Sequence, residues 1–474
     1  MNSSSTYSST KERFDSLAHS WEKWKGRNRY YHTQLIKLMQ FLIPQKSSVL
    51  EIGCALGDLI DAVEPSIGVG IDISPEMVRL AQKKYPKFTF YSMDAEELSL
   101  PATFDYIIMS DLVGHLRDIQ RALDRARTVM TKRSRLILTY YNFLWEPIVL
   151  LSEKFGLKTP QQRQNWINSH DLHNLLDLAD FEIVRTGYRL LIPKNIPLVS
   201  WFVNKYLTQL PFFRKMCIVR YIIARPRVIE LNPNQYSVSV IIPARNEKGN
   251  IESAVQRIPE MGRGSEIIFI EGGSNDGTFD KIMNVAATYG TKKNIRYFHQ
   301  PGKGKANAVR EGFARAQGDI LMILDADLTV APEDLTKFYS TLATNHGEFI
   351  NGSRLVYPME KQAMRFLNLL GNKFFSVMFS YLLDQRFKDT LCGTKVLFKS
   401  DYEKIAANRS YFGEFDPFGD FDLIFGAAKQ NLKIVEIPIR YAERTYGETN
   451  IQRWRHGLLL FQMVMVAARR LKFI

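Results

Sequence analysis

Residues 320–328 constrain the fold of this chain more than any other stretch. The apolar run 320–324 has the length and composition of a buried strand, and Asp325 and Asp327 follow it directly. Alternate residues of an extended strand point to the same side, so both carboxylates are expected to face one point. Such a pair at a strand's carboxyl end suits Mg²⁺ or Mn²⁺, which keep positions for water and phosphate oxygens. The alternative is a solvated strand end in which an aspartate caps the next turn.

Length and charge narrow the class of protein. A chain of 474 residues is expected to form two or more domains, and 45% hydrophobic with 24% charged residues is typical of globular proteins. The net charge of +14 is spread along the chain, with 30 Lys+Arg against 22 Asp+Glu in residues 1–225 and 33 against 27 in the rest. A nucleic-acid reader usually concentrates its charge, so we expect an anionic small substrate or an anionic membrane surface instead.

The cysteines and the apolar runs indicate the compartment. Cys54, Cys217 and Cys392 lie far apart, which suits a reducing compartment and predicts neither a disulfide framework nor a metal cluster. The Ser-rich first ten residues lack the apolar region of a secretory signal, and no run reaches the roughly 20 apolar residues of a membrane span. We therefore expect a cytoplasmic protein.

The first half alternates strand-like and helical segments. Residues 11–43 are expected to be helical and to stop at Pro44. Four strand-like segments follow, which predicts a parallel, doubly wound sheet. Each segment ends in glycine or acidic residues. Glycine lets the protein backbone come close to a bound nucleotide, and an acid can accept hydrogen bonds from ribose hydroxyls. In chain order these residues are Glu51, Gly53 and Gly57, then Asp72, then Asp94, then Asp111.

Over residues 11–185 this pattern resembles the class I S-adenosylmethionine-dependent methyltransferases. The resemblance implies that Gly53 and Gly57 make room for the methionine end of the cofactor. It places Asp72 at the ribose and Asp94 by the adenine, and Glu51 and Asp111 complete the expected cofactor-binding set. Ala55 stands where the family often has glycine. The alternative is a Rossmann-like domain that binds another nucleotide or none.

The methyl acceptor cannot be read from the sequence. His115 follows the fourth strand and is a candidate general base, because an unperturbed imidazole takes up a proton near neutrality; the alternative is a structural histidine. Residues 186–225 are apolar, aromatic and basic, which fits a domain core, a lid, a subunit face or a membrane-surface patch. Residues 226–236, with Pro226 and Pro233, are expected to be the linker.

The second half has the composition of a nucleotide-diphosphate site. Pro243 and Glu247 follow the strand that begins at residue 237, and Glu271 follows the next strand. Lys303 and Lys305 lie at a predicted helix start, where backbone N–H groups and ammonium charge favour phosphate. Carboxylates at strand ends can contact a base and a ribose, and the Asp325/Asp327 pair supplies the metal bridge.

Over residues 237–450 this order resembles the family-two glycosyltransferases of GT-A fold, in particular the dolichyl- or polyprenyl-phosphate sugar synthases. The residues that carry the likeness are 324–328, Pro332-Glu333-Asp334 and Asn351-Gly352-Ser353-Arg354. The resemblance implies that Pro243 and Glu247 border the nucleotide and that Asp325 and Asp327 hold metal and diphosphate. It also implies that Arg354 contacts phosphate and that Asp389 lines the acceptor side. Glu271-Gly272 stands where the family commonly has two aspartates, which leaves the choice of base open.

The charge that develops on a leaving nucleoside diphosphate predicts a metal-assisted, inverting sugar transfer. A hydroxyl acceptor needs a carboxylate base, for which Asp420 and Asp422 are the candidates by position, whereas a lipid phosphate needs none. The alternative role for Asp420 is to cap a helix that starts near Leu423.

Two apolar stretches, 365–383 and 457–474, carry interspersed or terminal basic residues. Each is too short to span a bilayer and suits a helix lying in a membrane interface; the alternative is a core or subunit helix.

The prediction is therefore an α/β chain of two doubly wound domains. A Rossmann-like methyltransferase (1–225) and a linker (226–236) precede a GT-A nucleotide-sugar domain (237–450) and a basic amphipathic C-terminal helix (451–474). We expect a bifunctional enzyme using S-adenosylmethionine and Mg²⁺ or Mn²⁺, with a nucleoside-diphosphate sugar and a lipid-phosphate or glycolipid acceptor, peripheral on the inner face of the membrane. No nucleic-acid partner is expected, and self-association is left open. The alternatives are an inactive scaffold, against which the intact acids argue, and a nucleic-acid methyltransferase.

Overall fold

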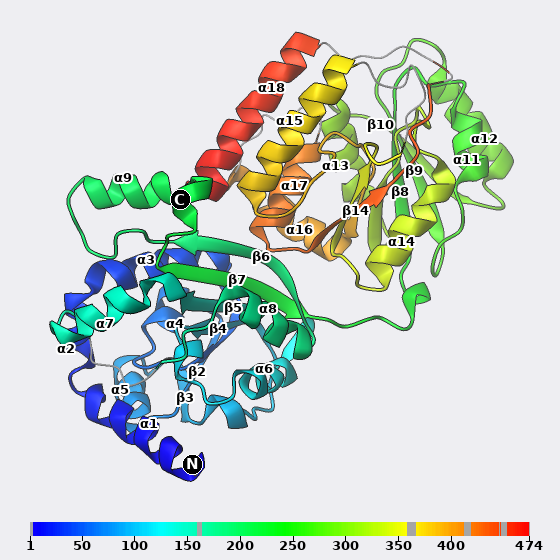
Figure 1. Ribbon diagram of the computed structural model, residues 1–474. Coiled ribbons are helices and arrows are strands. Elements are labelled where there is room, and N and C mark those ends of the chain that lie inside the picture. Colours follow the sequence, from blue (N-terminus) through cyan, green and yellow to red (C-terminus); the bar gives the residue numbers. More distant parts are fainter. Residues whose placement is uncertain are drawn as a thin grey trace. The chain divides into compact units, whose positions relative to one another are not determined.

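The computed structural model describes residues 3–158, 164–357, 366–411, 419–444, 446 and 453–473, with the side chains of 3–9, 366–370 and 453–457 left out (Figure 1). The chain divides into two compact units, Met1–Val228 and Ile229–Ile474. The division falls within the stretch 226–236. Each unit is described by itself.

The first unit is built on a seven-stranded sheet of order β3-β2-β1-β4-β5-β7-β6. The strands are β1 (Ser48–Ile52), β2 (Ile67–Asp72), β3 (Thr89–Ser92), β4 (Phe104–Ser110), β5 (Met130–Tyr141), β6 (Phe181–Arg189) and β7 (Val219–Pro226). The first five strands are parallel, whereas β7 runs antiparallel to both β5 and β6. The sheet is therefore mixed rather than wholly parallel, and the end of the apolar stretch 186–225 forms a buried strand of it.

Helices surround this sheet (Figure 1). They are α1 (Ser3–Ala18), α2 (Trp21–Arg27), α3 (Arg29–Leu42), α4 (Asp58–Ala62), α5 (Pro75–Lys84), α6 (Ile119–Thr128), α7 (Glu146–Lys154), α8 (Ser169–Leu178), α9 (Val199–Lys205) and α10 (Pro211–Arg214). The predicted helical stretch 11–43 is thus three helices, broken near Ser20 and at Asn28.

The second unit also has a seven-stranded mixed sheet, of order β10-β9-β8-β11-β13-β12-β14. The strands are β8 (Val238–Ala244), β9 (Ser265–Glu271), β10 (Asn294–His299), β11 (Ile320–Ile323), β12 (Phe349–Ser353), β13 (Lys395–Phe398) and β14 (Ile434–Pro438). Strands β10, β9, β8 and β11 are parallel, and β13 is antiparallel to β11 and β12. The two units confirm the predicted α/β class.

The helices of the second unit are α11 (Ile251–Arg257), α12 (Thr278–Tyr289), α13 (Lys305–Arg315), α14 (Leu335–Ala343), α15 (Phe366–Leu383), α16 (Lys399–Ala407), α17 (Asp420–Lys429) and α18 (Arg453–Ala467). Residues 451, 452 and 474 of the predicted C-terminal helix lie outside the described residues. Helices α15 and α18 pack against each other (Figure 1). Among the described residues, none of the helices has the length and apolar character needed to cross a bilayer.

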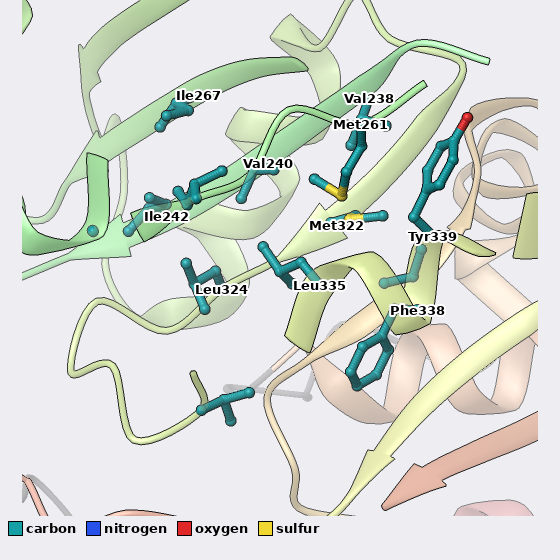
Figure 2. Packing of buried hydrophobic residues seen from close by; sticks show 14 of the residues in the cluster. Val238, Val240, Ile242, Met261, Ile267, Met322, Leu324, Leu335, Phe338 and Tyr339 are labelled. Carbon is teal, nitrogen blue, oxygen red and sulfur yellow. The ribbon is translucent and has the colours of Figure 1, made fainter. Parts of the chain in front are cut away.

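The core beneath β8 and β11 positions the acid pair. Alternate residues of β8, Val238, Val240 and Ile242, point to the face on which α14 packs through Leu335 and Phe338 (Figure 2). Burying such side chains stabilises the fold by about 1.5–3 kcal/mol each. Leu324 N–H donates to Ile241 O at 3.0 Å, so the chain leaves β11 in a fixed position immediately before Asp325.

Candidate active sites

A cavity of about 360 Å³ lies at the carboxyl ends of β1, β2 and β4 in the first unit. The predicted residues that line it are Glu51, Gly53, Asp72, Asp94, Asp111 and His115. Gly57 is not among the lining residues. It precedes α4 with φ +77°, and a β-carbon there would lie 2.7 Å from the ring of Phe90. Glycine is therefore needed at this position because a side chain would clash and would strain the backbone.

Asp72 joins the turns that follow β1 and β2. Its carboxylate accepts from Ala55 N–H and from Ser74 N–H, each at 2.9 Å. Burial raises the pKa of Asp72, and these two backbone donors oppose the shift. Ala55 itself has φ +45°, a left-handed conformation in which glycine is less strained. The turn therefore adopts the backbone of a glycine-rich loop although alanine occupies this position.

Glu51 brings an unsatisfied carboxylate to the cavity. Its side chain is buried, and its Oε2 has no hydrogen-bond partner within the described part of the chain. Burial raises the pKa of Glu51 well above its ordinary value. A buried polar atom without a partner is costly, so this oxygen points to a polar or cationic ligand group in the cavity.

Asp94 and Asp111 are held differently. Asp94 accepts from Glu96 N–H at 3.0 Å and pairs with Arg117 at 3.2 Å. Asp111 accepts from the hydroxyls of Tyr31 at 2.6 Å and Thr139 at 3.0 Å, and burial raises its pKa. Asp94 is thus tied to a cation, whereas the hydrogen-bond donors of Asp111 are neutral hydroxyls, and the positive charge of Lys158 opposes the rise in its pKa.

His115 packs edge-on against Phe14, with ring centroids 5.5 Å apart. Burial, with the positive charges of Arg13 and Lys158, lowers the pKa of His115 to about 3. The imidazole is therefore neutral near pH 7, but it is a weak proton acceptor, which fits poorly with the predicted role of general base.

In the second unit, Asp325 and Asp327 lie in a turn beyond β11 and not on the strand. The strand ends at Ile323, and Leu328 N–H donates to Asp325 O at 3.1 Å to close the turn. The prediction that both side chains share one face of an extended strand is therefore wrong, because neither residue belongs to the strand. Both carboxylates nevertheless raise the pKa of one ammonium group, that of Lys305, against the effect of burial.

Lys305 is the first residue of α13, and its Nζ lies 2.5 Å from Asp325 Oδ1. Gly393 lies directly against this pair, since a β-carbon there would be 2.0 Å from Asp325 Oδ2 and 2.6 Å from Lys305 Nζ. Lys303, in contrast, is an exposed residue of the preceding loop. Only one of the two predicted lysines therefore contacts the acid pair.

Arg444 joins two of the predicted acids. Its Nη2 donates to Asp327 Oδ2 at 2.8 Å and its Nη1 to Glu247 Oε1 at 2.9 Å, while Thr329 donates to Asp327 Oδ1 through N–H and hydroxyl. Sequence reasoning missed Arg444 because it is separated from Asp327 by 117 residues and belongs to no recognised motif. Its position shortly after β14 was the only available signal.

Arg354 and Asp389 form a buried bidentate pair. Arg354 Nε and Nη2 donate to the two carboxylate oxygens at 2.6 and 2.9 Å, and Asn372 and Leu391 N–H donate to Asp389 as well. Burial would raise the pKa of Asp389, but Arg354 holds it at about 2. Arg354 is therefore oriented by Asp389, and only the guanidinium atoms outside this pair can face a ligand.

Asp420 and Asp422 both have cationic partners. Lys395, fully buried, donates to Asp420 Oδ1 at 2.9 Å, and Asp422 pairs with Arg310 and Arg409. Helix α17 begins at Asp420 with Gly419 as its N-cap and no side-chain cap hydrogen bond. The expectation that Asp420 caps a helix starting near Leu423 is therefore wrong.

The remaining predicted residues lie at the ends of β8 and β9. Pro243 is paired in register with Ile270, beside Ala244 and Glu271. Glu271 accepts from Ser274 N–H at 2.6 Å and lies 3.2 Å from His299 Nδ1. Its carboxylate is thus turned into the loop that follows β9.

Each unit matches a different protein family. Residues 24–186 match the family described as "Methyltransferase domain", and residues 239–405 match "Glycosyl transferase family 2". The chain joins a methyltransferase domain to a family 2 glycosyltransferase domain.

Among curated proteins, the glycosyltransferase domain is similar to Glycosyltransferase AglJ of Haloferax volcanii, with 27% identity over 231 residues, 48% of this chain and 71% of that protein. It is 29% identical to a dolichol-phosphate mannosyltransferase of Pyrococcus furiosus over 241 residues, 50% of this chain and 64% of that protein. A dolichol-phosphate mannosyltransferase of Saccharomyces cerevisiae is 36% identical over 110 residues, 22% of this chain and 40% of that protein. The chain thus spans 40–71% of the length of these relatives.

Among solved structures, a methyltransferase of Thermotoga maritima matches with TM-score 0.36 and 18% identity, over 46% of this chain and 99% of that one. Magnesium protoporphyrin IX methyltransferase of Synechocystis matches with TM-score 0.33 and 19% identity, over 47% of this chain and 99% of that one. At this level of similarity neither match carries an argument about the site.

The oxygen ligands available to a divalent metal in the glycosyltransferase domain are few. Within the described ranges, no group of three or more His, Cys, Asp or Glu residues could hold an ion. Mg²⁺ commonly uses only one or two carboxylates together with substrate phosphates, so Asp325 and Asp327 are the residues that would hold such an ion. In the structure Asp325 is paired with Lys305 and Asp327 with Arg444.

Proposed function

We propose that the chain is a bifunctional enzyme. The glycosyltransferase domain transfers a sugar from a nucleoside-diphosphate sugar to a polyprenyl phosphate or another lipid or glycan acceptor, with inversion and with Mg²⁺ or Mn²⁺. The methyltransferase domain transfers a methyl group from S-adenosylmethionine to an acceptor of the same pathway. The names of the relatives in Pyrococcus and Saccharomyces support a lipid-phosphate acceptor.

The observation that carries the sugar-transfer proposal is that cationic and acidic side chains are paired around Asp325. Lys305 lies against Asp325 and is also stabilised in its charged form by Asp327 and Asp420, and Arg444 joins Asp327 to Glu247. Fixed cations beside a pair of carboxylates form a site for a diphosphate with its counter-ion. A divalent ion held by Asp325 and Asp327 would supply Lewis-acid stabilisation of the leaving group.

The residues of the chain have distinct tasks in this proposal. Lys305 and Arg444 bind the oxygens of the leaving diphosphate, and Glu247 and Asp327 hold Arg444 in place. Arg354, oriented by Asp389, attracts the charge of the acceptor. A phosphate acceptor is already anionic and needs no base, so Asp420 and Asp422 remain paired with their cations and position Lys395 and α17.

The methyltransferase proposal depends on the unsatisfied Oε2 of Glu51. This oxygen can accept from the amino group of the cofactor's methionine end, while Asp72 and Asp94 lie at the ends of β2 and β3, where ribose and adenine contacts are made. S-Adenosylmethionine when bound supplies the electrophilic methyl group. Asp111, with a raised pKa and a place on the cavity wall, is better suited than His115 to take a proton from an acceptor.

We further propose that the protein is peripheral on the cytoplasmic face of a membrane. Helices α15 and α18 expose the apolar side chains of Phe374, Val377, Leu458 and Phe461. These side chains suit shallow insertion into a bilayer interface. Lys472 does not contribute charge to that surface, because it is buried and its Nζ lies 2.5 Å from Asp384.

The function is tested by nucleoside-diphosphate release from a panel of UDP-, GDP- and TDP-sugars, with Mn²⁺ and a short-chain polyprenyl phosphate. We expect turnover that requires Mn²⁺ and is lost in Asp327→Ala, while S-adenosylhomocysteine still raises the thermal stability of the variant. Turnover that is indifferent to both metal and substitution contradicts the glycosyltransferase proposal. Vesicle binding that is unchanged by Leu458→Ser with Phe461→Ser contradicts the role of α15 and α18 at the membrane.

A further inference from the structure

The methyltransferase unit exposes many large apolar side chains, two of which line its cavity. One group of side chains belongs to η3 (Phe143–Trp145), α7 and the residues after it, and another to Leu198, α9, α10 and the residues between these helices. We call these exposed side chains the apolar rim: Leu144, Ile148, Leu151, Phe155, Leu157, Leu198, Trp201, Phe202, Leu210 and Phe212. Leu198 is 83% and Phe212 is 72% exposed. Apolar residues gathered in this way on a folded unit usually mark an interaction site.

The two groups of the apolar rim are neighbours in the folded unit. Trp145 Nε1 donates to Met216 O at 2.7 Å, which ties the start of α7 to the residues after α10. The residues after α7 and the residues before α9 also meet the junction of α2 and α3. Arg27 donates to Gly156 O at 3.2 Å, and Lys194 donates to Arg27 O at 3.2 Å and to Asn28 Oδ1 at 2.9 Å. The chain segments that carry the two groups are therefore held to each other and to the junction of α2 and α3.

The rim also borders the cavity. Ile148 and Leu157 line the cavity and are themselves 54% and 55% exposed, so the cavity opens to the outside between rim residues. Lys194 and Trp145 line the cavity as well. Whatever covers the rim therefore lies at the entrance through which an acceptor reaches the predicted methyl-transfer site.

Charge identifies the class of partner. Residues 190–217, which contain the second group, include Lys194, Lys205, Arg214 and Lys215 but no Asp or Glu. Lysine is depleted in the cores of protein–protein interfaces, whereas basic residues beside exposed aromatic side chains are typical of segments that bind anionic lipid. Trp201 and Tyr206 add the amphipathic rings that favour the depth of lipid headgroups.

We propose that the apolar rim docks the methyltransferase unit onto an anionic lipid surface, with Trp201 and Phe212 inserted and Lys205 and Lys215 facing the headgroups. Docking in this way brings the entrance of the cavity to the lipid, so an acceptor anchored in the bilayer can enter from there. The statement about the acceptor rests on the proposed methyl transfer, whereas the docking itself does not.

The test is flotation of the full-length protein with vesicles of phosphatidylcholine, alone or mixed with phosphatidylglycerol. We expect binding that is stronger with phosphatidylglycerol, weaker at high salt, and about tenfold or more weaker in the double variant Trp201→Ser with Phe212→Ser. Leu178→Ser is the matched control, because Leu178 is 64% exposed in α8 of the same unit but lies outside the rim, and it should bind like the parent.

A second measurement does not depend on a disruptive substitution. Brominated lipids should quench tryptophan fluorescence in the parent, and Trp201→Phe should keep vesicle binding while losing part of the quenching. Equal binding by the parent and the double variant, or a double variant that turns a dimer into a monomer while the parent ignores vesicles, overturns the proposal. Calorimetry of S-adenosylhomocysteine binding to the same proteins tests the proposed methyl transfer separately from the docking.

Discussion

Substitution of Gly393 by alanine should disable sugar transfer without disturbing the rest of the molecule. Gly393 lies just before β13, against the ion pair of Asp325 and Lys305. An added β-carbon would lie 2.0 Å from Asp325 Oδ2 and 2.6 Å from Lys305 Nζ. Real β-carbons almost never approach another heavy atom within 3.0 Å, so the carboxylate has to move by about 1 Å or more.

The size of this displacement sets the expected effect. A misplacement of about 1 Å in a reacting geometry costs about 100-fold in rate, so we expect kcat/KM for donor turnover to fall by about 100-fold. The atoms that must move are the ends of side chains and not backbone, so the free energy of unfolding should change little. The loss should therefore appear in catalysis and not in folding.

The assay is Mn²⁺-dependent release of nucleoside diphosphate from the accepted donor, with thermal unfolding measured alongside. Gly371→Ala is the matched control: apart from the backbone of α15 itself, no atom of the described residues lies within 4 Å of a β-carbon there. Alanine inside α15 should stabilise the helix by about 0.5–1 kcal/mol. A Gly393→Ala enzyme whose kcat/KM lies near that of the parent would refute the reasoning, because Asp325 would then have no need of its position.

Three further outcomes follow from the described contacts. His115, with a pKa of about 3, stays neutral in the folded state, while the unfolded chain takes up a proton below about pH 6.5. Lowering the pH from 7 to 5 should therefore cost about 2 kcal/mol of stability through His115, in addition to the loss through the buried His32. In urea denaturation the total loss should be about 2 kcal/mol smaller in His115→Gln and unchanged in the exposed-site control His170→Gln. Asp389→Ala should destabilise the protein by about 3–5 kcal/mol in the same assay, because the buried guanidinium of Arg354 loses its counter-ion; a loss below about 1 kcal/mol would argue against the pair. Arg444→Met should raise the KM for the sugar nucleotide by about tenfold or more, since it removes the cation shared by two carboxylates, and an unchanged KM in steady-state kinetics would exclude Arg444 from the donor site.

Features that depend on local sequence were predictable. Apolar runs that end in acids or glycines predicted the positions of β1, β2, β4, β8, β9 and β11. They did so because strand burial and turn formation depend on the identity of a few neighbouring residues. The turn after β1 and the helix start at Lys305 follow from the same local rules. The α/β class of both halves was therefore accessible from sequence alone.

Features that depend on partners distant in sequence were not predictable. No local pattern shows that Arg444 reaches Asp327 or that Lys395 pairs with Asp420. The antiparallel strand β7 was hidden within an apolar stretch whose alternation is weak, because both of its faces are buried. The reason given for the shared direction of Asp325 and Asp327 also failed, since a strand that ends at Ile323 leaves their orientation to turn geometry.

The central claim is that Asp325 and Asp327 hold a cation that in turn holds a diphosphate. Isothermal titration of a nucleoside diphosphate into the full-length protein tests it, with and without Mn²⁺, for the parent and for Asp327→Asn. We expect binding by the parent only with Mn²⁺ and an affinity at least about 100-fold lower in Asp327→Asn, with S-adenosylhomocysteine binding equal in both proteins. Equal nucleotide affinity in the two proteins, or binding that does not depend on Mn²⁺, would contradict the claim.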